Sequence, residues 1–156
     1  MLKNKTLFFA IQLFFLNSVF ASENSSIKVI DAWISEAPPT VSVLAAYADI
    51  QNMTQESKAL VSVSSPAFPK IELHLSKVIN DTATMEKQES LTIPANSTMK
   101  LSPGAYHLML FNPEAPLKSG DTVDLNFNFA DGTSIPATAT VKKRSNGGHD
   151  HHHHHH

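Results

Sequence analysis

Residues 70–88 of the chain read KIELHLSKVINDTATMEKQ, and this stretch decides the fold class. In its first half, isoleucine and leucine alternate with polar residues, which is the period of a strand with one buried face. Asn80 and Asp81 then form a turn signal, and residues 82–88 return as the partner strand of a hairpin. The stretch therefore predicts antiparallel β structure, with residues 70–79 paired to the strand that follows.

The same kind of pattern recurs along the chain on both sides of this hairpin. Thr122–Ala130 (TVDLNFNFA) alternates strongly and ends in the turn signal Asp131-Gly132. Ser102-Pro103-Gly104-Ala105 fits a type II turn, whose third position requires the positive φ that glycine adopts freely. About eight or nine short strands with frequent turns predict an all-β domain, an antiparallel sandwich or Greek-key barrel. The other predicted strands cover residues 27–35, 45–53, 59–64, 98–101, 106–111 and 134–142.

The N-terminal segment differs in composition from this domain. Met1–Ala21 carries Lys3 and Lys5, then an apolar run too short to span a bilayer, and ends in a small residue. This pattern is typical of a secretory signal peptide cleaved before Ser22. We therefore expect a mature domain over residues 22–142, located in a bacterial periplasm and without a membrane span after cleavage.

A flexible histidine-rich tail is predicted over residues 143–156. It matches both a native extension and an expression tag, and the lead-in Gly147-Gly148-His149-Asp150 favours a native one. Ligation by imidazoles alone suits Cu(II) and also zinc or nickel, so a site here would be less selective. The residues of this secondary Cu(II) site would be His149, His151, His152, His153, His154, His155 and His156.

Composition excludes several classes of function. The sequence has no cysteine, which excludes disulfides, thiolate metal sites, cysteine nucleophiles and attachment of a lipid to a cysteine. It has 12 basic and 14 acidic residues, and the mature chain is more acidic still because Lys3 and Lys5 leave with the signal. Nothing in this balance resembles a surface for nucleic acid or anionic lipid.

Four residues form a candidate metal site. Outside the tail the only histidines are His74 and His107, and each falls on the strand face opposite the apolar one. Met109 projects from the same face as His107, and Met85 can lie near His74 across the hairpin. Such residues singly are more often core filler or solvated, but two imidazoles, each beside a thioether on a non-core face, favour a soft metal ion. Thioether sulfur selects Cu(I) and is a poor ligand for zinc, magnesium or calcium.

The spacing of these residues, H-x10-M-x21-H-x-M, resembles the signature of the periplasmic copper chaperones called PCu(A)C. The resemblance covers about residues 29–141. It includes the opening Asp31-Ala32-Trp33, the segment Glu72-Leu73-His74 and the segment Pro103–Met109. One departure is Ser35-Glu36, which stands where a basic residue is expected and bears on a docking surface rather than on the ligands.

The resemblance implies a cupredoxin-like β-sandwich that binds one Cu(I) at an exposed site through His74, Met85, His107 and Met109. It further implies delivery of that copper to the binuclear centre in subunit II of cytochrome c oxidase, with a thiol copper chaperone as a further candidate partner. Exposure suits this task, because an incoming ligand must reach the ion.

Two other classes of function compete with the copper carrier. A β-sandwich that binds another ligand or mediates adhesion, with incidental histidines, remains the alternative. A copper enzyme is disfavoured, because the mature N-terminal residue would be Ser22 rather than a histidine and the donor set offers no general base. Among other residues, Met99 is expected to pack, with a place near the site as the alternative. Glu72 is expected to be solvated, with a hydrogen bond to an imidazole of the site as the alternative.

Overall fold

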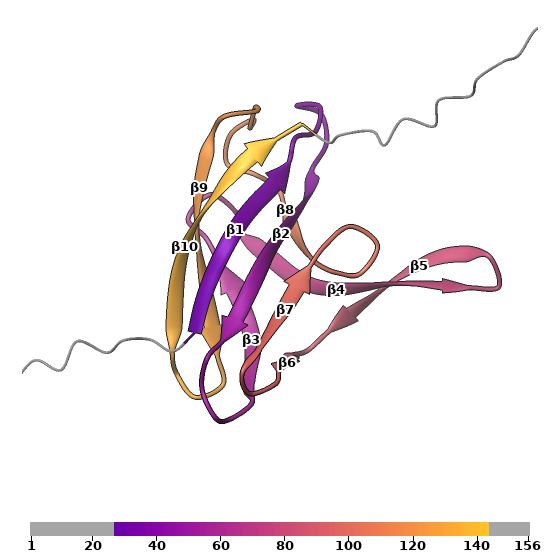
Figure 1. Cartoon of the computed structure of the whole chain (residues 1–156). Coiled ribbons are helices and arrows are strands. Elements are labelled where there is room, and N and C mark those ends of the chain that lie inside the picture. The colour runs from indigo at the N-terminus through magenta and orange to yellow at the C-terminus, as the bar shows by residue number, and fades with distance from the viewer. Residues whose placement is uncertain (1–26, 144–156) are drawn as a thin grey trace, which may run out of the picture.

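The computed structural model describes residues 27–143, and every regular element in that range is a strand (Figure 1). The predicted signal peptide, its cleavage site and the histidines of the tail lie outside the described residues. No helix long and apolar enough to cross a membrane occurs between residues 27 and 143. The strands are β1 (Ile27–Ser35), β2 (Val43–Asn52), β3 (Lys58–Ser64), β4 (Lys70–Ile79), β5 (Thr82–Gln88), β6 (Leu91–Ile93), β7 (Ser97–Leu101), β8 (Tyr106–Phe111), β9 (Thr122–Phe129) and β10 (Ser134–Lys142).

The strands form one hydrogen-bonded path in the order β5-β4-β8-β2-β1-β10-β9-β3-β6, and β7 pairs with β2 beside β8. All pairs are antiparallel except one, because β1 runs parallel to β10. This parallel pair differs from the fully antiparallel sheet expected from the sequence. The path folds over so that β3 lies against β4 across the core. The all-β, cupredoxin-like architecture predicted from the sequence is confirmed.

Alternate residues of the strands fill the core. On β9 the inward side chains are Val123, Leu125, Phe127 and Phe129, as the alternation predicted. On β8 the buried Leu108 and Leu110 lie opposite the apolar residues of β4. The other face of β4 and β8 is therefore left to the intervening polar and sulfur-containing side chains.

The turn between β7 and β8 has the predicted geometry. Ala105 N donates to Ser102 O at 3.0 Å, and Gly104 has a φ of +82°. A residue with a Cβ would be strained at that φ, although no atom lies within 4 Å of the position that a Cβ would take. This turn sets where β8 begins, and therefore where His107 lies.

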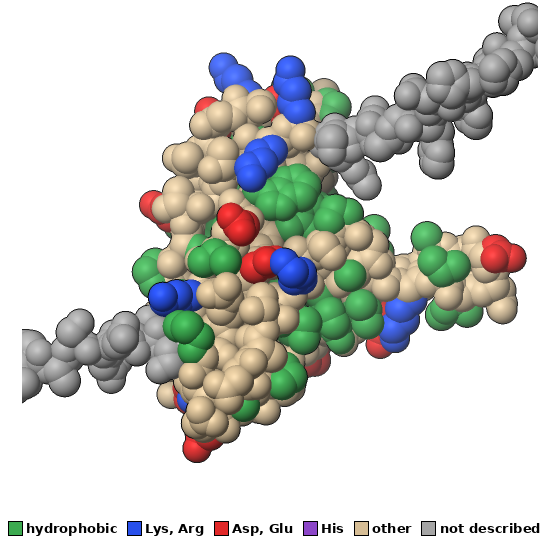
Figure 2. Space-filling view, viewed as in Figure 1, with side chains coloured by type: hydrophobic (Ala, Val, Ile, Leu, Met, Phe, Trp, Pro, Cys, Tyr) green, Lys and Arg blue, Asp and Glu red, His purple; other side chains and the backbone are tan. Residues whose placement is uncertain are grey.

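The β4–β5 hairpin forms an arm that projects from the body of the domain (Figure 1). Strand β5 is at the end of the sheet path and pairs with β4 alone. The outer part of the arm exposes Val78, Ile79 and Met85. Figure 2 shows further hydrophobic side chains gathered on the body, where β1, β2 and β8 lie side by side.

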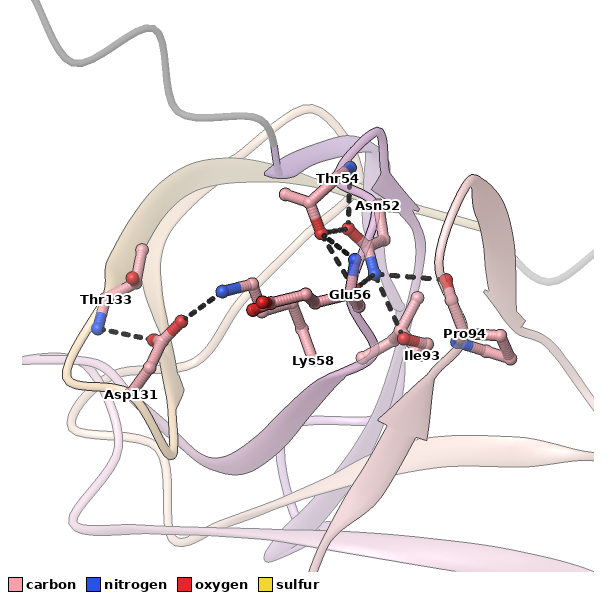
Figure 3. A network of polar contacts seen from close by, with 8 residues as sticks. All are labelled: Asn52, Thr54, Glu56, Lys58, Ile93, Pro94, Asp131 and Thr133. Atoms are coloured by element: carbon pink, nitrogen blue, oxygen red, sulfur yellow. Dashed lines mark hydrogen bonds and ion pairs between the residues drawn. The ribbon is translucent and has the colours of Figure 1, made fainter.

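A buried asparagine ties together the end of β2, the loop that follows it and the end of β6 (Figure 3). The amide nitrogen of Asn52, at the end of β2, donates to the carbonyl oxygens of Glu56, Ile93 and Pro94. Its oxygen accepts from the backbone nitrogen of Thr54 at 3.0 Å. The side chain is thus satisfied in the interior, and it fixes the position of β6, a strand the sequence did not predict.

Candidate metal centre

His74 and His107 lie directly opposite each other on the adjacent strands β4 and β8. Directly paired residues of antiparallel strands project from the same face, with Cβ atoms ~4.5–5.5 Å apart. The centroids of the two imidazole rings are 6.0 Å apart and the rings are tilted by 38°. Two metal–nitrogen bonds of about 2.0 Å fit within that separation. The structure therefore brings together the two histidines singled out in the sequence.

The backbone of the β7–β8 turn holds His107. The carbonyl oxygen of Ala105 accepts a hydrogen bond from Nδ1 of His107 at 3.0 Å. The same oxygen accepts from the backbone nitrogen of Ser76 on β4 at 3.1 Å. A carbonyl can only accept, so Nδ1 of His107 carries the proton and Nε2 is left for another partner.

His74 has one satisfied nitrogen and one that is not. Its Nε2 lies 3.0 Å from Oε2 of Glu72, whereas its Nδ1 is buried and has no hydrogen-bond partner. The imidazole is only 13 % exposed. An unpartnered buried nitrogen beside a second imidazole is what a metal-binding histidine shows when no metal is present, so the donor set fits a metal ion.

Glu72 is a functional neighbour for which the sequence interpretation named both possible roles and favoured the wrong one. We expected a solvated carboxylate, but this side chain bonds His74 and lies 2.9 Å from Lys70 and 3.6 Å from Lys87. The hydrogen bond to His74 and then that to Lys70 lower the pKa of Glu72 to about 2. The signal in the sequence was the spacing Lys-x-Glu-x-His on one strand face, whereas Lys87 is brought close only by the pairing of β4 with β5.

Met109 and Met85 lie on the same face as the histidines, on either side of His74. Met109 is paired with Glu72, and Met85 is paired with Ser76. Each is thus a diagonal neighbour of His74, a relation that places residues ~7–8 Å apart. Met85 is 64 % exposed on the projecting arm.

The two methionines are well separated from each other along the sheet. Their partners on β4, Glu72 and Ser76, are four residues apart, which is ~13 Å at ~3.3 Å per residue. Two strand spacings of ~4.8 Å are added across the sheet. The register therefore makes His74, His107 and Met109 neighbours on one face of the sheet. Convergence of Met85 on the same ion requires the arm to bend toward β8 and stays a prediction.

His107 is not exposed as we expected, because only 4 % of its surface is accessible. It shares the outer face of the sheet with ring side chains on both neighbouring strands. His74 stands on β4, and continuing the β2–β8 register by one position from the pair Ala46–Leu108 sets Tyr47 opposite His107. Tyr47 is itself paired with Trp33 of β1, with ring centroids 4.4 Å apart. Two ring pairs, Trp33–Tyr47 and His74–His107, are thus found on neighbouring strands of this part of the sheet.

The other candidate residues are placed away from this face. Met99 is paired with the buried Ile50 and packs against the core, as expected. Within residues 27–143, no group of three or more His, Cys, Asp or Glu side chains is arranged to hold a metal ion. Glu36, at the departure from the signature, accepts a hydrogen bond from the backbone nitrogen of Ser119 at 2.9 Å.

A match to a protein-family model shows which family the chain belongs to. The LpqE-like model, described as "Putative lipoprotein LpqE-like", matches residues 27–141. The chain belongs to the LpqE-like family. The LpqE-like chain is 32% identical over 117 residues to "Putative lipoprotein Lxx21020" of Leifsonia xyli subsp. xyli, a match that covers 74% of this chain and 69% of that protein. It is 29% identical over 118 residues to "Uncharacterized protein RP573" of Rickettsia prowazekii, covering 70% of this chain and 62% of that relative.

Solved structures similar to this LpqE-like chain include PCuAC domains. The solution structure of CuI-DR1885 from Deinococcus radiodurans is 30% identical, with a TM-score of 0.60 over 73% of this chain and 76% of that one. The copper-bound PCuAC domain from PmoF2 has a TM-score of 0.65 at 17% identity and covers 76% of this chain and 93% of that domain. The predicted resemblance to PCu(A)C domains is therefore confirmed.

Proposed function

We propose that the chain is a periplasmic, non-enzymatic carrier that binds one Cu(I) through His74, Met85, His107 and Met109. We further propose that it delivers this copper to the binuclear centre in subunit II of cytochrome c oxidase. A thiol copper chaperone is a candidate partner that would load it. Copper is here the cargo and not a resident cofactor.

The observation that carries the proposal is the direct pairing of His74 with His107, with both methionines on the same face of the sheet. Imidazole and thioether are neutral donors, so they suit a soft monovalent ion. The structural similarity to CuI-DR1885 and to the copper-bound PmoF2 domain supports the same choice of metal.

The differing exposure of the donors supports the role of a carrier. His107 is buried and His74 nearly so, whereas Met85 lies on the solvent-exposed arm. An incoming ligand would therefore displace Met85 first, while the histidines still hold the ion. Stepwise exchange of this kind allows copper to pass to a recipient without being released into solvent.

Copper titration of residues 22–148 under reducing conditions tests the metal site. The ten strands that the structure describes lie between residues 27 and 142, so this truncation keeps every described element. We expect one Cu(I) per chain, and X-ray absorption should count nitrogen and sulfur neighbours together. Absence of stoichiometric binding would overturn the proposal and favour the alternative of a module that binds another ligand.

A double substitution tests whether the two methionines bind the copper. Replacing Met85 and Met109 together by Leu keeps size and apolarity but removes both sulfurs, so folding should survive while Cu(I) affinity collapses. Met53→Leu is the control, because Met53 is an exposed methionine outside the candidate set. Full Cu(I) affinity in the double variant would exclude the thioethers as ligands.

Delivery has its own measurement. The Cu(I)-loaded chain is mixed with the metal-free soluble domain of subunit II, and the two are separated and assayed for copper. We expect transfer to the oxidase domain. Retention of all copper by the carrier would leave the metal site standing but exclude this recipient.

A further inference from the structure

The geometry points to Glu72 as a positioning residue that fixes which nitrogen of His74 faces the copper. Glu72 holds His74 in the neutral form whose proton is on Nε2, so that copper binds this histidine through Nδ1. This inference rests on the proposed function. His107, held at Nδ1 by Ala105, binds instead through Nε2. The two histidines of the site would thus present different ring nitrogens to one ion.

The two oxygens of the Glu72 carboxylate have separate partners. Oε1 lies 2.9 Å from Nζ of Lys70 and 3.6 Å from Nζ of Lys87, while Oε2 lies 3.0 Å from Nε2 of His74. The ammonium groups of the lysines can only donate, so they occupy Oε1, and a carboxylate oxygen in such an arrangement accepts hydrogen bonds. The proton of the hydrogen bond must therefore reside on Nε2 of His74.

Contacts from two strands hold the carboxylate in this orientation. Lys70 is paired with Phe111 of β8, and its Nζ lies 4.5 Å from the centroid of that ring. Lys87 of β5 is paired with His74 itself. Because Lys70 is anchored on one side and Lys87 approaches from the other, Oε1 is occupied and Oε2 is left directed at the imidazole.

The remaining nitrogen of His74 is the one without a partner. In a neutral imidazole whose Nε2 carries the proton, Nδ1 bears the lone pair that a metal requires. This atom is buried and makes no hydrogen bond within the part of the chain that the structure describes. Histidines that bind metals commonly donate their other nitrogen to a carboxylate or to a backbone carbonyl, and Glu72 and Ala105 supply one partner of each kind.

The first test needs no copper. Long-range 1H–15N NMR spectra of the metal-free chain, recorded at a mildly alkaline pH, distinguish the two neutral forms of each imidazole. The signals are assigned by their loss in His74→Gln and His107→Gln. We expect His74 protonated at Nε2 and His107 protonated at Nδ1. Observation of His74 protonated at Nδ1 would overturn the inference, whatever the copper affinity of the chain.

The second test measures Cu(I) affinity by competition with a chelator in residues 22–148. Glu72→Leu removes the acceptor, so the preference of His74 for Nε2–H should be lost and the affinity should fall about tenfold or more. Glu72→Gln keeps an acceptor oxygen, so it should recover most of the preference for Nε2–H and most of the Cu(I) affinity. Glu86→Gln is the control, because Glu86 pairs with Lys77 on the arm and should change neither.

The outcomes separate this inference from the proposed function. If the unaltered chain fails to bind Cu(I), the proposed function fails, while the NMR result still decides the role of Glu72. If the unaltered chain binds Cu(I) but Glu72→Leu matches it in affinity and in the protonation pattern of His74, the positioning role is wrong and the carrier function stands.

Discussion

Asp131 illustrates how single charged residues support the domain. Its carboxylate lies 2.7 Å from Nζ of Lys58 and accepts from the backbone nitrogen of Thr133 at 3.0 Å (Figure 3). The hydrogen bond from Lys58, followed by those from Thr133, lowers the pKa of Asp131, and the same pair raises the pKa of Lys58. The pair joins the start of β3 to the β9–β10 turn.

Acid should remove this contribution. A carboxylate whose pKa is lowered by folding stabilises the folded state above its ordinary pKa of ~3.9, and that stabilisation is lost as the pH falls toward the lowered value. Asp131→Asn should therefore lower Tm slightly at pH 7, and its difference from the unaltered chain should shrink below about pH 4. Asp81→Asn, in the β4–β5 turn, is the matched control. A difference in Tm that stays constant down to pH 2 would contradict the role of this pair.

For single residues, the sequence predicted the strand face of each histidine but not its burial or its partners. The alternation placed His74 and His107 on non-core faces, because the period of a strand is fixed by local geometry. It could not show that His107 is buried, since burial depends on neighbouring strands that only the fold brings beside β8. For the same reason the role of Glu72 depended on Lys87, which only the register of the hairpin brings close.

At the scale of the elements, the β7–β8 turn links stability to the candidate metal centre. Gly104→Ala should cost about 1–2 kcal/mol of unfolding free energy, because a side chain is strained at positive φ. Since the neighbouring Ala105 carbonyl holds His107, Cu(I) affinity should fall as well. Gly132→Ala, at a φ of +86° in the remote β9–β10 turn, should cost similar stability without changing Cu(I) affinity. Equal Cu(I) affinities in the two variants would show that the conformation of the β7–β8 turn does not affect the metal site.

The projecting arm should respond to the metal. Strand β5 has one neighbour and its side chains are exposed, so its amides should exchange faster than those of the central strands. If the arm bends to bring Met85 onto the ion, Cu(I) should slow exchange in β5. This change should be absent in Met85→Leu. Unchanged exchange in β5 on Cu(I) binding would indicate that Met85 stays outside the site.

Most strands could be predicted from alternation and turn residues, and β1, β4, β5, β8 and β10 have the predicted bounds. Strand β6 was missed because three residues are too few to show a period of two. Its place is fixed instead by the buried side chain of Asn52, whose partners lie far away in the sequence.

For the whole molecule, the tail and the domain should bind copper independently. Removing residues 149–156 should leave Cu(I) affinity nearly unchanged, because the thioethers remain in the domain. It should remove most Cu(II) binding, because the tail holds the only dense group of imidazoles in the sequence. Titrations of the full and shortened chains with each oxidation state measure both effects. A large loss of Cu(I) affinity on shortening would show that the tail contributes ligands to the domain site.

The parallel pairing of β1 with β10 also constrains the order in which the chain can fold. Strand β10 stands between β1 and β9, so without it the sheet divides into one group of strands around β2 and β8 and another of β9, β3 and β6. A polypeptide that emerges N-terminus first therefore carries its entire metal-binding half before it can join the two groups. Until the last strand arrives, β1 and β9 present open edges that invite pairing with other chains. Pairing of the two groups of strands therefore requires β10, the last strand that the structure describes.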